Sequence, residues 1–231
     1  MSFFDALETR GPDERESALR AALAQQIVKA KTLVGYSENF TDVDPVCFQT
    51  ISDLSTLPVL RKSDLTRAQK PGQALGGFNA RPLSHFAHVF QSPGPIYEPG
   101  GSELDWWRMG RFLHAVGIGK GDIVQNCFGY HLTPAGMIFE SGARAVGAAV
   151  MPAGVGQTEL QVRAAVDVAT TAYAGTPDYL KIIMDMANEM GECLSITKAA
   201  VGGGALFPSL RQEYADRGVT CLQSYATADL G

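Results

Sequence analysis

The residues best suited to chemistry in this chain are an aromatic ring and an acid near its C-terminal end. Tyr225 is followed four residues later by Asp229, in the segment SYATADLG that comes directly after an apolar run. A tyrosine ring can stack on a nucleotide base, and an aspartate oxygen is a ligand that Mg²⁺ prefers. The pair favours a magnesium–nucleotide site, although a buried tyrosine beside a solvated aspartate is the commoner use of these residue types.

Three consecutive glycines form a second candidate contact. Gly202, Gly203 and Gly204 follow another apolar run and precede Ala205. Without side chains, their backbone amides and carbonyls could meet a flat heterocycle edge-on. A flexible turn between a strand and a helix uses glycine as well. A nucleotide contact and an ordinary turn therefore remain as alternatives.

Two ring side chains, Tyr130 and His131, occupy a third predicted loop. A tyrosine ring can wall a substrate pocket, and an imidazole can reach a carboxylate or a phosphate. Histidine is more often a hydrogen-bonded structural residue than a ligand. The loop is therefore a candidate border of a substrate pocket.

Other patterns exclude several common sites. Gly154 and Gly156 begin a dinucleotide-binding pattern, but Glu159 occupies the place of its third glycine. The chain has no Walker phosphate-binding sequence and no GxSxG motif of a hydrolase. The cysteines lie far apart without a CxxC pair, so a zinc site has no support. A reductase with a nicotinamide cofactor therefore ranks last among the functions considered.

Alternating helix and strand patterns must position these residues. After Glu103, helices that often begin near proline and end near glycine alternate with short apolar runs. This alternation predicts an α/β fold, a mainly parallel sheet with helices on both faces, whose ligands bind beyond the carboxyl ends of the strands. The predicted helices are Leu104–Val116, Pro134–Val146, Thr158–Val168, Pro177–Met190 and Pro208–Arg217, and the predicted strands are Asp122–Cys127, Ala148–Met151, Ala172–Ala174, Lys198–Val201 and Val219–Gln223.

The beginning of the chain has a different pattern. Pro12 suits a first helical position, and apolar residues recur at helical spacing as far as Val34, before Gly35. Turn formers then dominate up to Pro82. We therefore predict an N-terminal helix with an irregular covering segment over residues 1–82 and an α/β core that binds nucleotide and acyl group over residues 83–231.

Composition excludes some partners. The net charge of −5 comes from 24 acidic and 19 basic residues spread along the chain, without a basic cluster for nucleic acid. The N-terminus lacks the pattern of a signal peptide, and no apolar run approaches the ~20 residues of a membrane span. We expect a cytoplasmic protein without a nucleic-acid or membrane partner.

Collinear motifs resemble one known family. The segments GDIVQNCFGYHLTPAG, FESGARAVGAAVMPAG and GQTELQ are similar to the phenylacetate-CoA ligase family of the adenylate-forming (acyl-CoA synthetase) superfamily. GTPDYLKII, GGGALFPSLR and SYATADLG then fall where this family has its next three motifs. The likeness covers most of the chain and implies the N-terminal domain of an adenylate-forming enzyme.

The resemblance implies a reaction. Such a ligase activates a carboxylic acid with ATP and Mg²⁺ to an acyl adenylate, then transfers the acyl group to CoA, and the family's acids are aryl or arylacetic. A carboxylate needs a good leaving group before a thiol can attack it, and the protein contributes positioning and charge stabilisation. The implied nucleotide-binding residues are Ser92, Gly94, Gly202, Gly203, Gly204, Tyr225 and Ala226, the implied catalytic residues Thr227 and Asp229, with Asp229 on Mg²⁺, and the implied acyl-pocket residues Tyr130, His131 and Gly154.

The chain departs from the family at three motifs. The family's phosphate loop is rich in hydroxyl residues, whereas the segment that starts at Ser92 and includes Gly94 places Pro93, Pro95 and Ile96 there. Proline also removes backbone donors, so a triphosphate should bind less well. In the last motif the family's glutamate is replaced by an aspartate and a serine or threonine by alanine, while the glycine run lacks its usual acid.

The family continues past the last motif, through a hinge and a C-terminal domain with an adenylation lysine. On this resemblance we expect the chain to be incomplete and poorly active alone, and a homodimer is in keeping with the family. The alternative from another class is a non-catalytic remnant that binds an aromatic acid or a nucleotide for regulation or assembly. A gene that encodes the lysine domain would favour the enzyme.

Overall fold

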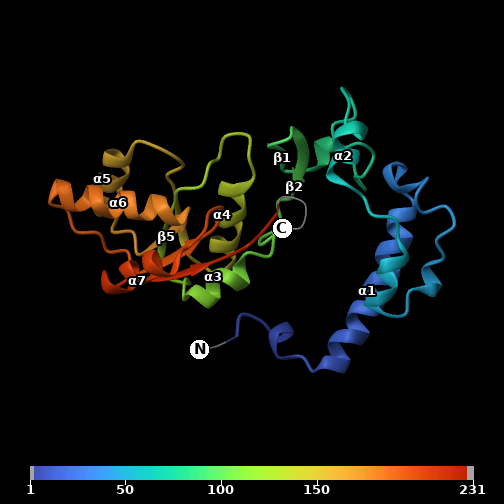
Figure 1. The fold of residues 1–231 in the computed structure, drawn as a ribbon, viewed down its shortest axis with the longest axis horizontal. Helices are drawn as coiled ribbons and strands as arrows, with labels where there is room; N and C mark the ends of the chain where they lie inside the picture. The colour runs from blue at the N-terminus through green and yellow to red at the C-terminus, as the bar shows by residue number, and fades with distance from the viewer. Residues whose placement is uncertain (1–2, 228–231) are drawn as a thin grey trace. The chain divides into compact units, whose positions relative to one another are not determined.

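The computed structural model describes residues 3–227. It forms two compact units, Met1–Gly101 and Ser102–Gly231, of which each is described by itself. Figure 1 shows the first unit in blue to green and the second in green to red. The hairpin around Ser92, which the sequence analysis assigned to the α/β core, lies in the first unit. The predicted boundary between residues 82 and 83 itself stays a prediction.

The first unit is built from one long helix, a hairpin and short helical turns. Helix α1 starts at a proline, carries acids in its first turn and lysines in its last, and thus matches the helix dipole at both ends. Only Ile27 and Ala30 of this helix are buried. The elements are η1 (Ala6–Thr9), α1 (Pro12–Lys31), η2 (Val34–Tyr36), η3 (Pro45–Cys47), η4 (Ile51–Thr56), α2 (Lys62–Ala68), η5 (Leu83–His85), β1 (His88–Ser92) and β2 (Ile96–Gly100).

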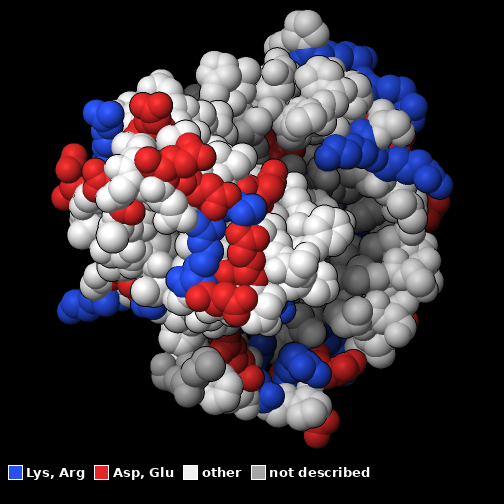
Figure 2. Space-filling view, turned by 60° about the vertical axis from the view of Figure 1, so that its left-hand side comes forward, with Lys and Arg blue, Asp and Glu red and all other residues white. Residues whose placement is uncertain are grey.

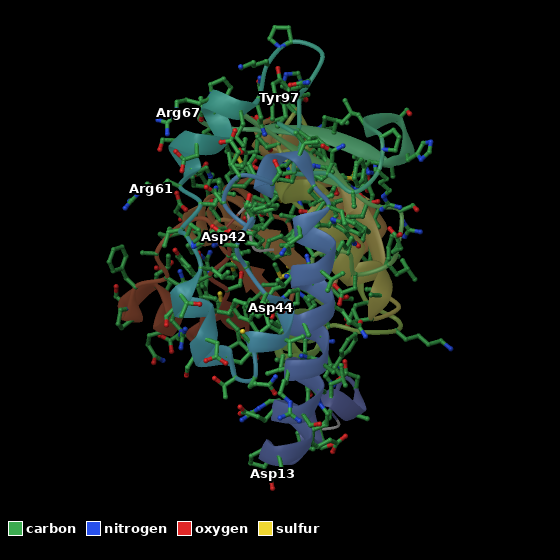
Figure 3. All side chains as sticks on the ribbon, turned by 90° about the vertical axis from the view of Figure 1, so that its right-hand side faces the viewer. Asp13, Asp42, Asp44, Arg61, Arg67 and Tyr97 are labelled. Carbon is green, nitrogen blue, oxygen red and sulfur yellow. The ribbon has the colours of Figure 1, made fainter. Side chains whose placement is uncertain are left out.

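The hairpin β1–β2 is fixed to the end of α2 by one side chain. The two strands are antiparallel, with His88 opposite Gly100 and Ser92 opposite Ile96. Gln69 donates to the carbonyl of Tyr97 at 2.9 Å and accepts from the amide of Tyr97 at 2.8 Å. Figure 3 shows Tyr97 near the part of α2 that carries Arg67. The carboxamide therefore pairs with β2 in the manner of a further strand.

The second unit has a parallel sheet of five strands. The strand order is β4–β3–β5–β6–β7, and every neighbouring pair is parallel. This arrangement confirms the predicted α/β class. The elements are α3 (Gly110–Val116), β3 (Ile123–Asn126), α4 (Ala135–Ala145), β4 (Ala149–Pro152), α5 (Thr158–Val168), β5 (Ala172–Gly175), α6 (Pro177–Met190), β6 (Lys198–Val201), α7 (Pro208–Asp216) and β7 (Thr220–Gln223).

Helices cover both faces of this sheet. Successive side chains of a strand point to opposite faces, so one strand can contribute to two apolar clusters. On β5, Ala172 and Ala174 belong to the apolar cluster with α3 and α4. Tyr173, between them, belongs to the opposite cluster with α5, α6 and α7. The result is a three-layer α/β/α unit, whose two faces can be followed in Figure 1.

Two helices are shorter than predicted. The helix expected from Leu104 begins at Gly110. Asp105 and Arg108 have positive φ angles of 56° and 60°, so the chain turns there before the helix starts. The Asp105 carboxylate accepts from the Gly110 amide at 2.7 Å and thereby satisfies a free donor of the first turn. At the N-terminus, α1 ends at Lys31 rather than near Val34.

An ion pair at the amino ends of the strands fixes their register. Lys198 of β6 donates to both Asp122 oxygens, at 2.9 and 2.8 Å, next to β3. Asp122 also accepts from the Gly119 amide and from the hydroxyl of Thr171. Burial alone would raise the pKa of Asp122, but the hydrogen bonds from Lys198, Gly119 and Thr171 outweigh it and lower the pKa. This cluster joins strands at the edge opposite the predicted ligand site.

Candidate nucleotide and acyl site

The candidate site lies at the carboxyl edge of the sheet, where the loops after the parallel strands meet. The strands β3, β4, β6 and β7 are followed by the loops that carry Tyr130, Gly154, Gly203 and Tyr225. These strands lie in one parallel sheet. Parallel strands direct all their carboxyl ends to the same edge, which is where open α/β sheets bind ligands.

Asn126, the last residue of β3, connects three parts of this edge. Its side chain is fully buried and donates to the Tyr130 hydroxyl and to the Gly136 carbonyl, each at 2.8 Å. The side-chain oxygen of Asn126 accepts from the Phe128 amide at 3.2 Å, and its backbone carbonyl accepts from the Gly154 amide at 2.9 Å. The loops after β3 and β4 are thus fastened to the same residue.

Tyr130 lies against the first turn of α4. A Cβ atom at Gly136 would come within 2.8 Å of the Tyr130 ring, so this close approach requires glycine. Burial raises the pKa of the Tyr130 hydroxyl, and the negative charge of the Glu140 carboxylate raises the pKa further. The hydroxyl therefore stays protonated, and it accepts a hydrogen bond from Asn126.

The structure separates the neighbours Tyr130 and His131. The Tyr130 ring is half-buried, whereas His131 is exposed. The backbone carbonyl of His131 accepts from the Thr133 amide at 2.8 Å, so this residue takes part in the turn before α4. Of the two rings in this loop, it is Tyr130 that the network at the sheet edge holds in place.

Gln161 on α5 holds the loop that contains Gly154. Its buried carboxamide donates to the carbonyls of Gly154 at 3.0 Å and Gly156 at 2.8 Å. Its oxygen accepts from the side chain of Gln125 and from the thiol of Cys127, each at 3.1 Å. Burial raises the pKa of the Cys127 thiol, which keeps it a neutral donor. The loop that contains Gly154 is therefore tied to both α5 and β3.

The glycine loop after β6 is held by the neighbouring strand. Gln223 of β7 donates to the Gly204 carbonyl at 2.7 Å and accepts from the Leu206 amide at 3.2 Å. A Cβ atom at Gly202 would lie 3.0 Å from the Ser224 hydroxyl oxygen, so the two loops touch closely at this glycine. These contacts give the loop a defined conformation. Whether it can also contact a ligand depends on how much of its backbone is exposed.

The outer part of this loop is open to solvent. Gly203 is exposed and has a φ of 69°, and the nearest atoms to a Cβ placed there belong to Phe128 at 3.8 Å and Thr176 at 3.9 Å. Phe128 stacks on Phe139 with ring centroids 4.2 Å apart. A flat heterocycle over Gly203 would meet backbone, an aromatic ring and a threonine methyl, which suits an adenine.

The last motif extends from this edge. Tyr225 is 93% exposed, so its ring has both faces open for stacking. Ala226 is exposed and Thr227 is partly buried. Asp229, the predicted Mg²⁺ ligand, lies outside the described residues. Within residues 3–227 no group of three or more acidic, histidine or cysteine side chains is arranged to hold a metal ion.

Ser92 and Gly94 lie in the first unit, in the turn of the β1–β2 hairpin. The Ser92 side chain is buried, and its hydroxyl contacts the Ile96 carbonyl and the Glu98 carboxylate. Gly94 has a φ of 147°, which a glycine tolerates best. In this conformation the serine hydroxyl serves the hairpin itself. A role of these residues in binding a triphosphate stays a prediction.

The sequence analysis missed three residues that organise the site: Asn126, Gln161 and Gln223. Each places a carboxamide beside a loop that lacks regular hydrogen bonds. Gln125 and Asn126 stand in an otherwise apolar strand, and this break in the pattern was the available signal. The partners of a carboxamide depend on tertiary packing and leave no trace in a single sequence.

One surface hollow borders the loop that contains Gly154, at the first turn of α5. A hollow of about 600 Å³ beside the start of α5 is lined by Gln157, Thr158, Glu159, Leu160, Arg163 and Met186. The loop edge is the better candidate because its glycines and aromatic ring suit a nucleotide, whereas this hollow is open and its charged walls belong to a solvated helix face. Among the described residues, no helix is both long and apolar enough to cross a membrane.

Comparison with curated proteins finds several relatives with the same name. A phenylacetate-coenzyme A ligase of Thermus thermophilus is 30% identical over 181 residues, which are 74% of this chain and 40% of that protein. The corresponding ligase of Escherichia coli K12 is 27% identical over 98% of this chain and 54% of its own length. The chain is similar to one part of proteins named phenylacetate-coenzyme A ligase. No protein-family profile matches it.

Solved structures of acyl-CoA ligases share the fold of this chain. A 2-hydroxyisobutyryl-CoA ligase, in complex with 2-HIB-AMP and CoA, superposes with a TM-score of 0.85 over 95% of this chain and 51% of that one, at 20% identity. A second structure of that ligase, in the postadenylation state, gives 0.83. This likeness confirms the predicted fold of an adenylate-forming domain. The chain spans about half the length of the relatives that it matches.

Proposed function

We propose that this chain takes part in the ATP-dependent activation of a carboxylic acid to an acyl adenylate, followed by thioester formation with CoA. The observation that carries the proposal is the 30% identity to a phenylacetate-CoA ligase over 74% of the chain. The solved relative that shares the fold holds an acyl adenylate and CoA. On this proposal the acid is an aryl or arylacetic acid.

The roles of the described residues follow from their chemistry. The exposed turn at Gly203 would meet the adenine edge, and the open ring of Tyr225 would stack on its face. Tyr130 and the Gly154 loop would border the acyl group, with His131 at the rim. Mg²⁺ would neutralise phosphate charge, and Asp229 remains its proposed ligand, with Thr227 nearby. A cytoplasmic location and a homodimer also remain proposals.

A second candidate, a non-catalytic protein that binds an aromatic acid or a nucleotide, is favoured by one observation. The hydroxyl of Ser92 is engaged inside the hairpin, and the prolines on either side of Gly94 lack amide hydrogens. A phosphate loop with fewer donors binds a triphosphate more weakly. Binding of an aryl acid without turnover would fit this alternative.

Calorimetric titration of the purified chain tests the proposal. MgATP, phenylacetate and a panel of aryl and aliphatic acids are titrated separately, and acyl-adenylate formation is followed by pyrophosphate release. Saturable binding of both ATP and an aryl acid is the expected result. Binding of the acid alone would favour the second candidate. If the folded, monodisperse chain bound neither class of ligand, the proposed site would be wrong.

A further inference from the structure

The glycine loop after β6 packs against the turn that follows β5, at residues 175–177. The Gly202 amide donates to the Gly175 carbonyl at 3.1 Å. A Cβ atom at Gly204 would lie 3.3 Å from the Pro177 ring, so the other end of the loop touches the same turn. The conformation of the glycine loop therefore depends on where this turn is held.

Two buried tyrosines hold the turn. The Tyr173 hydroxyl donates to the Thr176 carbonyl at 2.9 Å, and the Tyr214 hydroxyl of α7 donates to the Pro177 carbonyl. Both side chains are fully buried and belong to the apolar cluster with α5, α6 and α7. A Cβ atom at Gly175 would lie 2.1 Å from the Tyr173 hydroxyl oxygen, so the phenol can reach this turn only beside a glycine. Two successive carbonyls of the turn thus each have a phenol donor.

Burial keeps both phenols as hydrogen-bond donors. It raises the pKa of the Tyr173 and Tyr214 hydroxyls, so both stay protonated at neutral pH. A phenol has a single hydrogen, and here each hydrogen goes to a backbone carbonyl. The Leu180 amide also donates to the Thr176 carbonyl, but at 3.4 Å this is a long hydrogen bond. Loss of the Tyr173 hydroxyl would therefore leave the Thr176 carbonyl poorly satisfied.

The turn also reaches the open part of the glycine loop. Gly203 is exposed, and a Cβ atom placed there would lie 3.9 Å from the Thr176 methyl carbon. On the proposed function, the adenine lies over Gly203. Because interiors are closely packed, a shift of the turn moves the Thr176 methyl and the loop backbone together. The loop that contains Gly154 has donors of its own, Gln161 and Tyr179.

We propose that Tyr173 and Tyr214 are positioning residues for the nucleotide, which hold the turn at residues 175–177 so that the glycine loop presents its backbone to the adenine. This inference rests on the proposed function, since it takes the glycine loop to be the adenine contact. Both phenols are buried and act through the turn rather than on a ligand. Their loss should therefore weaken nucleotide binding without a matching loss of acid binding.

Three variants test the positioning role by calorimetric titration: Tyr173→Phe, Tyr214→Phe and, as a control, Tyr36→Phe. Tyr36 is partly buried against Phe40 and Phe78 in the first unit and belongs to none of the loops of the candidate site. Each of the first two variants is expected to weaken MgATP binding roughly three- to tenfold, the effect of one net hydrogen bond. The affinity for phenylacetate should stay within about twofold of the original protein in all three.

Urea unfolding of the same variants separates positioning from stability. A merely structural hydroxyl would lower the free energy of unfolding and leave the affinity for MgATP unchanged. If Tyr173→Phe and Tyr214→Phe bound MgATP like the original protein, or lost MgATP and phenylacetate affinity equally, the inference would be overturned. Should Tyr214→Phe not fold, Tyr173→Phe carries the same comparison.

A measurement without ligand separates this inference from the proposed function. In the chain labelled with nitrogen-15, the amide signals of residues 202–204 are assigned by triple-resonance spectra. These signals are expected to shift in Tyr173→Phe and Tyr214→Phe but not in Tyr36→Phe. Unchanged signals in both variants would refute the hold on the glycine loop. If the signals shifted but the original chain bound no MgATP, the proposed function would be refuted instead, and the nucleotide role of the two tyrosines with it.

Discussion

Asn126 and Gln161 each hold an irregular loop in place through a buried carboxamide. The loops after β3 and β4 contain glycines and lack a regular ladder of hydrogen bonds, so their backbone groups need other partners. Asn126 donates to the Gly136 carbonyl in the first turn of α4, and its oxygen accepts from the Phe128 amide in the loop. Gln161 donates to the Gly154 carbonyl in its loop, and its oxygen accepts from the thiol of Cys127, directly after β3. Both side chains are buried, so their polar atoms bind protein groups rather than solvent. They give irregular loops a defined shape.

Gly136→Ala is expected to displace the Tyr130 ring. The added Cβ would lie 2.8 Å from the ring and 2.9 Å from the Gly129 carbonyl oxygen, a contact that needs movement. Overpacking of this kind lowers the free energy of unfolding by about 1–3 kcal/mol. Urea unfolding measures it. Gly129→Ala is a matched control, because its Cβ would meet only the Thr133 hydroxyl oxygen, at 3.6 Å. Equal stability of the two variants would contradict the prediction.

Gln161→Leu is expected to loosen the Gly154 loop. The change leaves the carbonyls of Gly154 and Gly156 without this donor and takes the acceptor from Cys127. The Gly156 carbonyl keeps the hydroxyl of Tyr179 as a donor, at 3.0 Å. The free energy of unfolding should therefore fall by about 1–3 kcal/mol, the cost of a lost hydrogen-bond partner in a buried place.

Hydrogen exchange of residues 152–158 measures this loosening directly and should become faster in Gln161→Leu. Gln212→Leu, on the exposed face of α7, is the control for the loss of a glutamine and should leave the exchange unchanged. Slow exchange of the loop in Gln161→Leu would show that other contacts hold it.

At the scale of elements, the sequence predicted best where local signals agree. The bounds of α6, Pro177–Met190, were predicted to the residue, because a proline starts the helix and Gly191 ends it in a left-handed conformation. The strand Lys198–Val201 was also predicted with its observed bounds. The start of α3 was wrong, because the turn at Asp105 and Arg108 requires positive φ angles that their residue types do not announce.

The candidate site was predictable only in outline. Parallel topology indicates that the loops with Tyr130, Gly154 and Gly203 share one edge of the sheet, which the observed strand order bears out. Which side chain fastens which loop depends on contacts between distant positions, such as Gln161 with Gly154 or Gln223 with Gly204. A single sequence contains no signal for such pairs.

The ion pair at the amino edge predicts how stability depends on pH. The folded state lowers the pKa of Asp122. The pair therefore contributes stability that is present above the unfolded pKa of about 3.9 and is lost as the pH falls through the lower folded value. Asp122→Asn should reduce the free energy of unfolding at pH 7 by about 1–3 kcal/mol.

Urea unfolding of Asp122→Asn from pH 7 to pH 3 measures this effect. The difference from the original protein should narrow below about pH 3.9, because the unfolded chain then takes up a proton at Asp122 that the folded state, with its lower pKa, binds less readily. Asp167→Asn, on an exposed part of α5, is the control and should show little difference at either end. A gap that stays constant with pH would exclude the ion pair as its origin.

At the scale of the whole molecule, the two units differ in how their cores are built. Both large apolar clusters consist of residues from the second unit, on the two faces of its sheet. The first unit has scattered buried residues such as Phe40, Phe48 and Leu75, and its chain runs through several short 3₁₀ helices. Charges on the second unit are intermixed in sign, as on the side that Figure 2 brings forward.

The rates of amide hydrogen exchange should therefore differ between the two units, with slower exchange in the second. Amides of β3, β5 and β6 are expected to exchange most slowly, because they lie within the sheet between two buried layers. Amides of residues 34–60 should exchange fastest among the described elements. Mass spectrometry of peptides after timed exchange measures both. Equal protection of the two units would indicate that they unfold as one cooperative body.

The position of Asn126 limits how related sequences can diverge. One carboxamide serves Tyr130, Gly136 and Phe128 at once, so its replacement withdraws a partner from three neighbours. Such a residue cannot drift alone. In descendants of a common ancestor, a change at position 126 should appear together with changes at 130 and 136, and a larger residue at 136 only beside a smaller one at 130. Substitutions at positions 126, 130 and 136 should therefore be correlated among related sequences.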